Sequence, residues 1–307
     1  MPDSIGIPAC FSSGERQTVE PGATLTRSGQ SVFMSVYRTK LAGLCRLIII
    51  TWCKNLLVNG LSISVQATNG SENHQCKVEL KPWYFWRKQG SKQFIVDGRA
   101  VDVVWDLRAA KFNGETEPQS GFYVAIVCEE EVVLLVGDLK KDAYRKTGCR
   151  PALIEPMLVS RKEHVFGKKR FTTRVRFIEK GKFHGISVEF INGGSSGSDI
   201  IGGRFDPQLE IKVDGKLAIL VKHLQWKFRG NESIHVNKST RVDVYWDVHD
   251  WLFGSGPRQG LFIFRLVSAS PSLLLTQEEE NYGLGLENDN SGGSSSFSLF
   301  LHAWKEE

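Results

Sequence analysis

Two strand-like segments of the chain are nearly identical although 141 residues separate them. Residues 101–106 read VDVVWD, and residues 242–247 read VDVYWD. Apolar and polar residues alternate in both segments, which places Val101, Val103 and Trp105 on one face of a β-strand. The recurrence predicts that the chain folds as two similar halves made of β-strands.

Three further motifs recur in the same order along the chain. They are Leu61-Ile63-Val65 with Leu209-Ile211-Val213, Trp86 and Gly90 with Trp226 and Gly230, and Gly121-Phe122 with Gly260-Leu261. The shifts differ by only a few residues, as loop insertions would cause. The predicted repeats therefore span about 44–127 and 183–266.

The spacing of turn-forming residues completes the prediction of fold class. Gly, Asn and Asp interrupt the apolar segments roughly every 8–15 residues, as is typical of antiparallel sheets. Two sheets packed face to face bury such alternating faces most simply. We therefore expect an all-β protein, an antiparallel β-sandwich built from two similar halves, with one short helix near 140–147.

Composition divides the chain into three predicted regions. Residues 1–30 are rich in Ser, Gly, Thr and Pro and are expected to form a disordered tail. Residues 31–270 form the predicted β-sandwich domain. Residues 271–307 are acidic and then Gly/Ser-rich, which is typical of a flexible tail. Within that tail, Phe297–Trp304 is apolar again, which favours its return to the core.

A β-hairpin is expected on either side of residues 179–182. A two-residue loop at Lys180-Gly181 would pair Val175 with Ile186 and Phe171 with Phe190, so that apolar residues face apolar residues. The arginines of the first strand would then lie together on the outer face.

This hairpin carries the strongest local charge of the chain. Residues 160–183 hold nine Lys and Arg against two Glu, an excess of +7, whereas the whole chain carries +5. An arginine-rich face can bind carboxylate or phosphate groups, so the predicted partners are acidic protein segments or anionic lipid headgroups. An ordinary solvated face that contacts the acidic Glu278–Glu280 segment is the alternative. The candidate binding residues are Lys168, Lys169, Arg170, Arg174, Arg176, Lys180 and Lys182.

Several classes of function receive no support from the sequence. Thirty-nine Lys and Arg against 34 Asp and Glu give too small an excess to indicate a nucleic-acid partner. The six cysteines form no C-x-x-C pair and the seven histidines no H-x-x-x-H spacing, so no metal or other cofactor is expected. With no export signal in the sequence, free thiols in a reducing compartment are expected. No apolar run approaches the ~20 residues of a transmembrane helix, and no secretory signal is visible. We expect a cytoplasmic, possibly nuclear, protein.

The repeated carboxylates do not form a recognisable catalytic pair. Asp102 and Asp106 lie four residues apart on one strand, about 13 Å, which exceeds either glycosidase separation. The sequence thus predicts a non-catalytic binding or adaptor protein. The alternative is a carbohydrate-active enzyme or sugar-binding module, with a cleft between the halves where Asp106 meets Asp247.

Tryptophans give a second expectation about exposure. Four of them recur in both halves at strand positions and are expected in the core, namely Trp86, Trp105, Trp226 and Trp246. Trp83 and Trp251 do not repeat and are the better candidates for exposure.

Several blocks of sequence, taken together, resemble a known plant family. They are TWCK (51–54), LKPW (80–83), VVWDL (103–107), GDLK (137–140), VSRKEHVFG (159–167), WKFRGNE (226–232) and WDVHDW (246–251). The set is similar to the family defined as domain of unknown function 868. The resemblance covers most of residues 34–266 and implies a plant protein. It implies no activity, cofactor or site residue.

Overall fold

The structure is a computed structural model that describes most of the chain between residues 31 and 305. The described ranges are 31–54, 59–66, 73–80, 88–166, 169–178, 181–193, 206–237, 240–255, 258–267 and 297–305. The predicted tail at 1–30 lies outside the described residues, as does 271–296.

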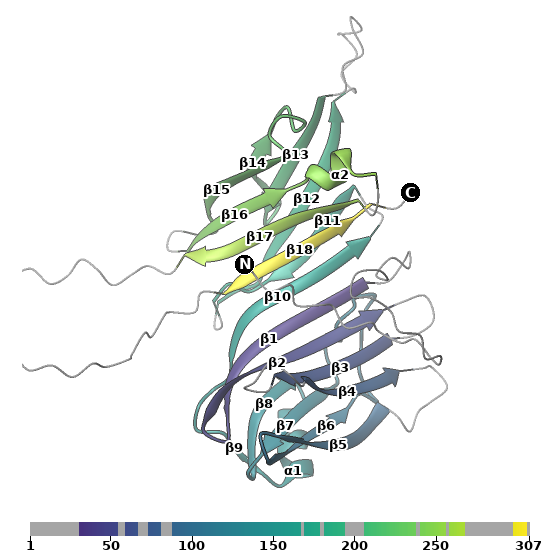
Figure 1. The fold of residues 1–307 in the computed structure, drawn as a ribbon, viewed down its shortest axis with the longest axis vertical. Coiled ribbons are helices and arrows are strands. Elements are labelled where there is room, and N and C mark those ends of the chain that lie inside the picture. The colour runs from purple at the N-terminus through teal and green to yellow at the C-terminus, as the bar shows by residue number, and fades with distance from the viewer. Residues whose placement is uncertain are drawn as a thin grey trace, which may run out of the picture.

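Eight strands and a helix make up the N-terminal half (Figure 1). They are β1 (Ser31–Leu41), β2 (Leu44–Lys54), β3 (Asn59–Gln66), β4 (Asn73–Leu80), β5 (Gln89–Val96), β6 (Arg99–Asp106), β7 (Tyr123–Cys128), β8 (Glu131–Gly137) and α1 (Lys140–Thr147).

Two linking strands and a second set of eight follow. They are β9 (Arg150–Pro151), β10 (Met157–Phe166), β11 (Arg170–Val175), β12 (His184–Gly193), β13 (Asp206–Val213), β14 (Lys216–Val221), β15 (Arg229–His235), β16 (Arg241–Asp247), β17 (Gln259–Val267) and β18 (Ser298–Trp304). The second helix, α2 (His249–Phe253), lies between β16 and β17. The helix expected near 140–147 is α1, whereas α2 was not expected.

The strands form three sheets. The nine-stranded sheet has the order β15-β16-β17-β18-β10-β1-β2-β3-β4, the four-stranded sheet β11-β12-β13-β14 and the five-stranded sheet β5-β6-β7-β8-β9. Nearly all neighbours are antiparallel, with parallel pairing at β10–β18 and β8–β9. The all-β, antiparallel fold class predicted from the sequence is confirmed.

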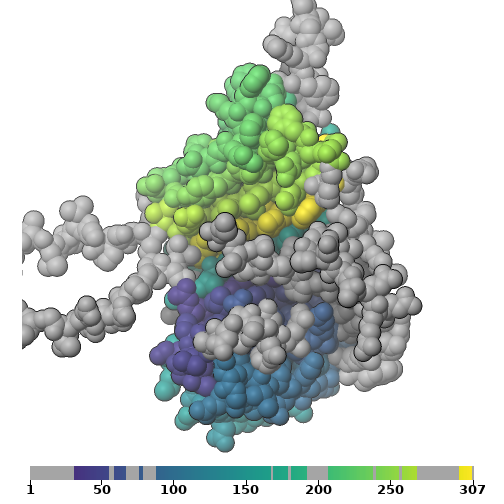
Figure 2. Space-filling model, in the orientation of Figure 1, coloured from purple at the N-terminus to yellow at the C-terminus, as the bar shows by residue number. Residues whose placement is uncertain are grey.

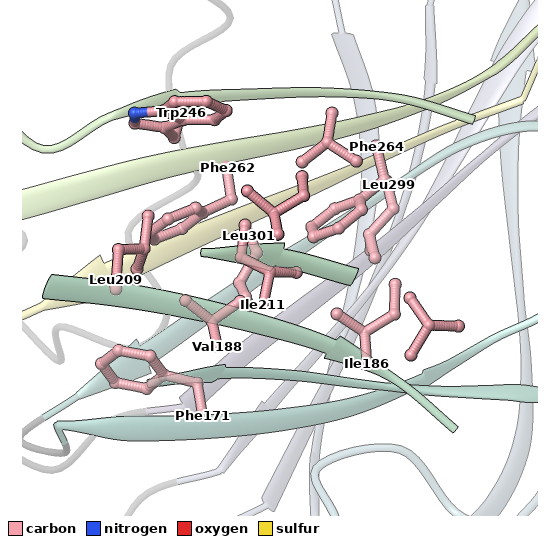
Figure 3. Close-up of a cluster of buried hydrophobic side chains, with 14 of the residues drawn as sticks. Phe171, Ile186, Val188, Leu209, Ile211, Trp246, Phe262, Phe264, Leu299 and Leu301 are labelled. Atoms are coloured by element: carbon pink, nitrogen blue, oxygen red, sulfur yellow. The ribbon is translucent and has the colours of Figure 1, made fainter. Parts of the chain in front are cut away.

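Each half buries one core between two layers of strands. In the N-terminal half, strands β1–β4 pack on β5–β8, and Trp52, Ile63 and Val103 lie in the shared core. In the C-terminal half, strands β11–β14 pack on β15–β18 (Figure 3). Figure 2 shows the two halves as stacked lobes, green above and purple to blue below. The nine-stranded sheet joins the lobes, because β1 of one half pairs with β10, which pairs with β18 of the other.

The two repeated motifs occupy corresponding places in these layers. Segment 101–106 is β6 and segment 242–247 is β16, each the second strand of its meander. Gly90 pairs with Trp105 and Gly230 with Trp246, and both indole rings lie over their glycine. The strand order is therefore the same in both halves, while the duplication itself stays a prediction.

Strand β18 corrects the predicted domain boundary. Residues 298–304 were placed in a flexible tail that began at 271, yet they pair with β10 on one side and β17 on the other. Leu299, Leu301 and Ala303 are fully buried there. The apolar alternation of Phe297–Trp304 was the correct signal, because a strand with one apolar face gains most by completing a sheet.

The predicted hairpin register is wrong by two residues. Val175 pairs with His184 rather than with Ile186, and Phe171 pairs with Val188 rather than with Phe190. The strands end earlier than predicted, at Val175 and His184, so the connection is longer than a two-residue turn. An even shift keeps every side chain on its predicted face, and the arginines of β11 still point outward.

The cysteines differ in one respect from the expectation of free thiols. Cys45, Cys76, Cys128 and Cys149 are free, whereas Cys53 is disulfide-bonded. Neither described helix is long and apolar enough to cross a membrane.

Candidate functional site

The predicted basic residues lie along the outer edge of the four-stranded sheet. Lys168 and Lys180 fall outside the described residues. The other five are exposed to solvent; they are Lys169, Arg170, Arg174, Arg176 and Lys182. The alternation of β11 explains this, because Phe171 and Val175 point into the core and their neighbours point outward.

Carboxylates of the same sheet balance part of this charge. The Nε atom of Arg170 lies 3.9 Å from Glu189 and 3.4 Å from the hydroxyl of Ser187. Lys212 bonds Glu210 at 2.6 Å and lies 3.9 Å from Glu189. These contacts hold Arg170 in a mixed network, so it contributes little free positive charge.

Lys182 is balanced in a similar way at the other end of the hairpin. Its Nζ lies 4.0 Å from Asp214. Asp214 also accepts from the ring of His184 at 2.8 Å and from the backbone N–H of Gly185 at 2.9 Å. The hydrogen bond from His184 is the main reason why the pKa of Asp214 is lowered, so this carboxylate stays charged.

Two arginines of the hairpin also share one aromatic ring. The guanidinium carbon of Arg174 lies 5.4 Å, and that of Arg176 4.3 Å, from the ring centroid of Phe183. Phe183 is 47% exposed, and Ile178 of the same loop is 49% exposed. We call Arg174, Arg176, Ile178 and Phe183 the hairpin patch. The patch combines two cations with exposed apolar surface. The sequence predicted the two arginines but not Ile178 and Phe183, because the prediction considered charge alone.

A pocket of about 630 Å³ lies on the opposite lobe, on the outer face of the five-stranded sheet beside α1. Its lining includes polar side chains from β5, β6, the turn after β6, β7 and α1. They are Gln89, Asp106, Arg108, Tyr123, Asp142, Arg145 and Lys146. Sequence reasoning did not find this pocket, because its residues are scattered over 58 positions and match no motif.

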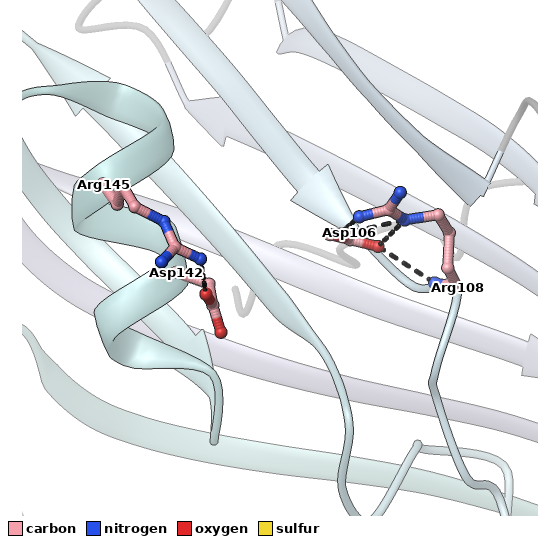
Figure 4. A network of polar contacts seen from close by, with 4 residues as sticks. All are labelled: Asp106, Arg108, Asp142 and Arg145. Atoms are coloured by element: carbon pink, nitrogen blue, oxygen red, sulfur yellow. Dashed lines mark hydrogen bonds and ion pairs between the residues drawn. The ribbon is translucent and has the colours of Figure 1, made fainter.

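The carboxylates of the pocket each hold an arginine (Figure 4). Asp106 accepts from Arg108 Nε at 3.0 Å and from Nη2 at 2.7 Å. Asp142 accepts from Arg145 within α1. The side-chain bond from Arg108 keeps the pKa of Asp106 below its usual value, so Asp106 remains a carboxylate.

The residues named for a sugar-active site lie apart. Asp106 ends a strand of the five-stranded sheet, and Asp247 ends β16 of the nine-stranded sheet, in the opposite lobe of Figure 1. Asp247 is bound to Arg229 at 2.8 Å and to the backbone N–H of His249. Each carboxylate is thus engaged within its own half.

Tryptophan exposure differs from the sequence expectation at two positions. Trp251 is buried, with its ring stacked 4.6 Å from that of Phe190, so it is not the exposed residue predicted. Trp226, predicted in the core, is 79% exposed in the turn before β15. Its repeat position indicated a core role, but it precedes the strand rather than lying in it. Trp105 and Trp246 are buried as predicted, while Trp83 and Trp86 lie outside the described residues.

A further charged cluster joins the two lobes. Arg161 of β10 bonds Glu117 at 3.1 Å, and its guanidinium lies 4.3 Å from the ring centroid of Phe33. On the same strand, Glu163 accepts from the hydroxyl of Thr173 at 2.6 Å. Burial raises the pKa of both glutamates. Among the described residues, no three His, Cys, Asp or Glu side chains come close enough to hold a metal ion.

The fold defines an all-β protein of two sandwich lobes joined by one continuous sheet. The family model described as "Plant protein of unknown function (DUF868)" matches residues 28–305. The chain therefore belongs to this plant family, which confirms the resemblance seen in its sequence blocks. None of the curated proteins compared with the chain matches it.

One solved structure shows a distant likeness. The crystal structure of kievitone hydratase from Nectria haematococca is 11% identical and covers 79% of this chain and 85% of its own. Its TM-score is 0.23, so the likeness carries no argument about fold or function.

Proposed function

We propose that this protein is a non-catalytic binding protein whose hairpin patch binds acidic segments of partner proteins. The observation that supports this most directly is the stacking of two guanidinium groups on one half-exposed ring, Phe183. Arginine and aromatic side chains are the types most enriched in the energetically dominant parts of protein interfaces.

The stacking favours binding because it restricts both side chains before a partner arrives. Each exposed cation–π contact contributes about 0.5–1 kcal/mol, and an arginine that is already oriented loses less side-chain entropy when it forms a bidentate bond. Two such groups side by side match two carboxylates spaced along an extended peptide.

The apolar part of the patch favours a peptide over a simple anion. Ile178 and Phe183 are both about half exposed, and burying them would contribute roughly 25 cal/mol per Å² of apolar surface. The preferred ligand is therefore an acidic segment that also carries apolar side chains.

The test replaces both stacked arginines with glutamate. A fluorescently labelled peptide of alternating Glu and Phe should bind the full chain, and its affinity should fall at least about tenfold in the Arg174→Glu/Arg176→Glu variant, because repulsion replaces two charge-assisted bonds. Fluorescence anisotropy at about 50 and about 300 mM salt should show weaker binding at the higher salt.

The matched control is Lys140→Glu/Lys141→Glu, which makes the same change in net charge on exposed positions of α1. It should bind the peptide as the wild type does. Equal loss in both variants would reduce the effect to net charge and overturn the proposal. Binding to phosphatidylserine vesicles without binding to the peptide would overturn it in favour of a lipid surface.

The predicted internal repeat and the cytoplasmic location remain part of this proposal. The equal strand order of the lobes and the paired Gly–Trp contacts support a duplication. Binding of the peptide by the hairpin patch does not depend on either.

A further inference from the structure

The pocket beside α1 has the size of a site for a small molecule. Its volume of about 630 Å³ falls within the ~300–1,000 Å³ of typical ligand sites. Leu139 and Ala109 contribute apolar surface to its lining, while the remaining groups are polar or charged.

The floor of the pocket is one rung of the sheet. Gln89 of β5 pairs with Asp106 of β6, which pairs in turn with Tyr123 of β7. Paired residues on adjacent strands point to the same face, so an amide, a carboxylate and a phenol lie in a row. On the same face, Ala125 and Val127 of β7 pack under α1, whereas Gln93 and Asp102 of the neighbouring strands are polar. A polar row beside the apolar cluster under α1 points to a ligand that needs hydrogen bonds.

The phenol of Tyr123 is a member of this row and lies in the lining of the pocket. The side chain is 1% exposed, and burial, followed by the negative charge of Asp106, raises its pKa. The hydroxyl therefore keeps its proton under physiological conditions, and a phenol that keeps its proton can donate a hydrogen bond.

The wall of the pocket carries an excess of positive charge. Arg108, Arg145 and Lys146 face the carboxylates Asp106 and Asp142. Asp106 engages Nε and Nη2 of Arg108, which fixes the plane of the guanidinium and leaves Nη1 for another acceptor. Among the described residues the structure gives Lys146 no carboxylate partner. Each arginine is already paired with one of the carboxylates, so the net positive charge of the wall comes from Lys146, and this excess favours a ligand with negative charge.

We propose that this pocket binds a small organic anion, a hydroxylated molecule with a carboxylate or phosphate group. The anionic group would lie between Arg108, Arg145 and Lys146, where charge-assisted bonds are strongest. The hydroxyl groups would bond the row of Gln89, Asp106 and Tyr123. This site lies on a different lobe from the hairpin patch, and the inference does not depend on the function proposed for that patch.

The test is calorimetric titration of the full chain with four probes. Citrate and glucose 6-phosphate represent the two anionic groups, inorganic phosphate lacks the hydroxylated body, and glucose lacks the charge. We expect one-to-one binding of citrate or glucose 6-phosphate, at least about tenfold weaker binding of inorganic phosphate, and no measurable binding of glucose. If neither organic anion binds at concentrations up to about 10 mM, the proposal is overturned.

Variants assign the binding to this pocket. Arg145→Gln/Lys146→Gln should weaken binding of the probe at least about tenfold, and Arg108→Gln provides a second, independent variant in the turn after β6. The control is Arg99→Gln, which removes an exposed arginine paired with Glu129 on the same sheet. Equal weakening by Arg99→Gln would overturn the assignment. The Arg174→Glu/Arg176→Glu variant should bind the probe as the wild type does, which separates this test from that of the hairpin patch.

Discussion

Lowering the pH from about 7 to about 5 should cost this protein about 4 kcal/mol of folding free energy, about 2 kcal/mol from each of two buried histidines. His164 of β10 and His302 of β18 are direct partners in the nine-stranded sheet, with rings stacked at 4.5 Å. Burial lowers the pKa of His164 to about 3 and that of His302 to about 4, from an ordinary value of 6.5.

The geometry around His164 requires the neutral ring. The indole Nε1–H of Trp304 donates to Nδ1 of His164 at 3.0 Å, and an indole nitrogen can only donate. A proton on Nδ1 would break this bond. It would also place a positive charge beside His302 and Lys162, both of which oppose the protonation of His164.

The sign of the effect follows from proton binding. Below about pH 6.5 the unfolded chain binds protons at both histidines, while the folded chain does so only near pH 3 to 4. The stability contributed by the neutral rings is therefore complete above pH 6.5 and is lost as the pH falls. The raised pKa values of Glu117 and Glu163 act in the opposite direction, so the histidine contribution is measured as a difference between variants.

The informative variant is His302→Phe, which keeps an aromatic ring in the stack. Urea unfolding at about pH 7 and about pH 5 should show that the loss of stability on acidification shrinks by about 2 kcal/mol. His235→Gln changes an exposed histidine of β15 and tests whether removal of any histidine has the same effect. If His302→Phe lost as much stability between pH 7 and pH 5 as the wild type does, this prediction would be contradicted.

Replacing Gly230 with alanine should destabilise the C-terminal lobe by about 2–3 kcal/mol. A Cβ atom on this residue would overlap Cζ2 and Cε2 of Trp246. The indole cannot move aside freely, because it is 8% exposed and its Nε1–H donates to the carbonyl of Lys227 at 3.1 Å. The new methyl group must either displace the ring and break that bond or shift strand β15 away from β16.

Gly185→Ala is the matched control on strand β12. A Cβ atom there meets nothing within 4 Å, so alanine should change stability by no more than about 0.5 kcal/mol. Thermal or urea unfolding of both variants gives the comparison. If Gly230→Ala were as stable as Gly185→Ala, the close contact of Gly230 with the Trp246 ring would not limit the choice of residue at 230.

Local alternation was enough to predict which faces of the strands are buried. In β6 and β16 the residues expected inside, such as Val103, Trp105 and Val244, lie in the cores. The hairpin at β11 and β12 shows the limit of the same reasoning. A period of two fixes the face of each side chain but not the register, because a shift by two residues satisfies the same pattern.

Turn and helix positions were harder to predict than strands. Recurrence in both halves predicts a buried Trp226, and its absence predicts an exposed Trp251. Their exposure is set instead by the turn before β15 and by helix α2 after β16. Neither feature has enough residues to produce a periodic signal.

The exposed arginines of the hairpin were predicted correctly as a group, but their ring partner Phe183 was not, because cation–π contacts depend on side-chain direction across the hairpin.

The sequence by itself determined the β character of the chain, the buried faces of its strands, the matching motifs of its two lobes and its family. These properties follow from residues close in sequence and from their spacing. Only the tertiary structure decided that β18 returns to join the lobes through β10, and that Gln89, Asp106 and Tyr123 share one rung beneath α1. The physical reason is that strand pairing between distant segments depends on the competition among whole-chain arrangements, which no local pattern encodes.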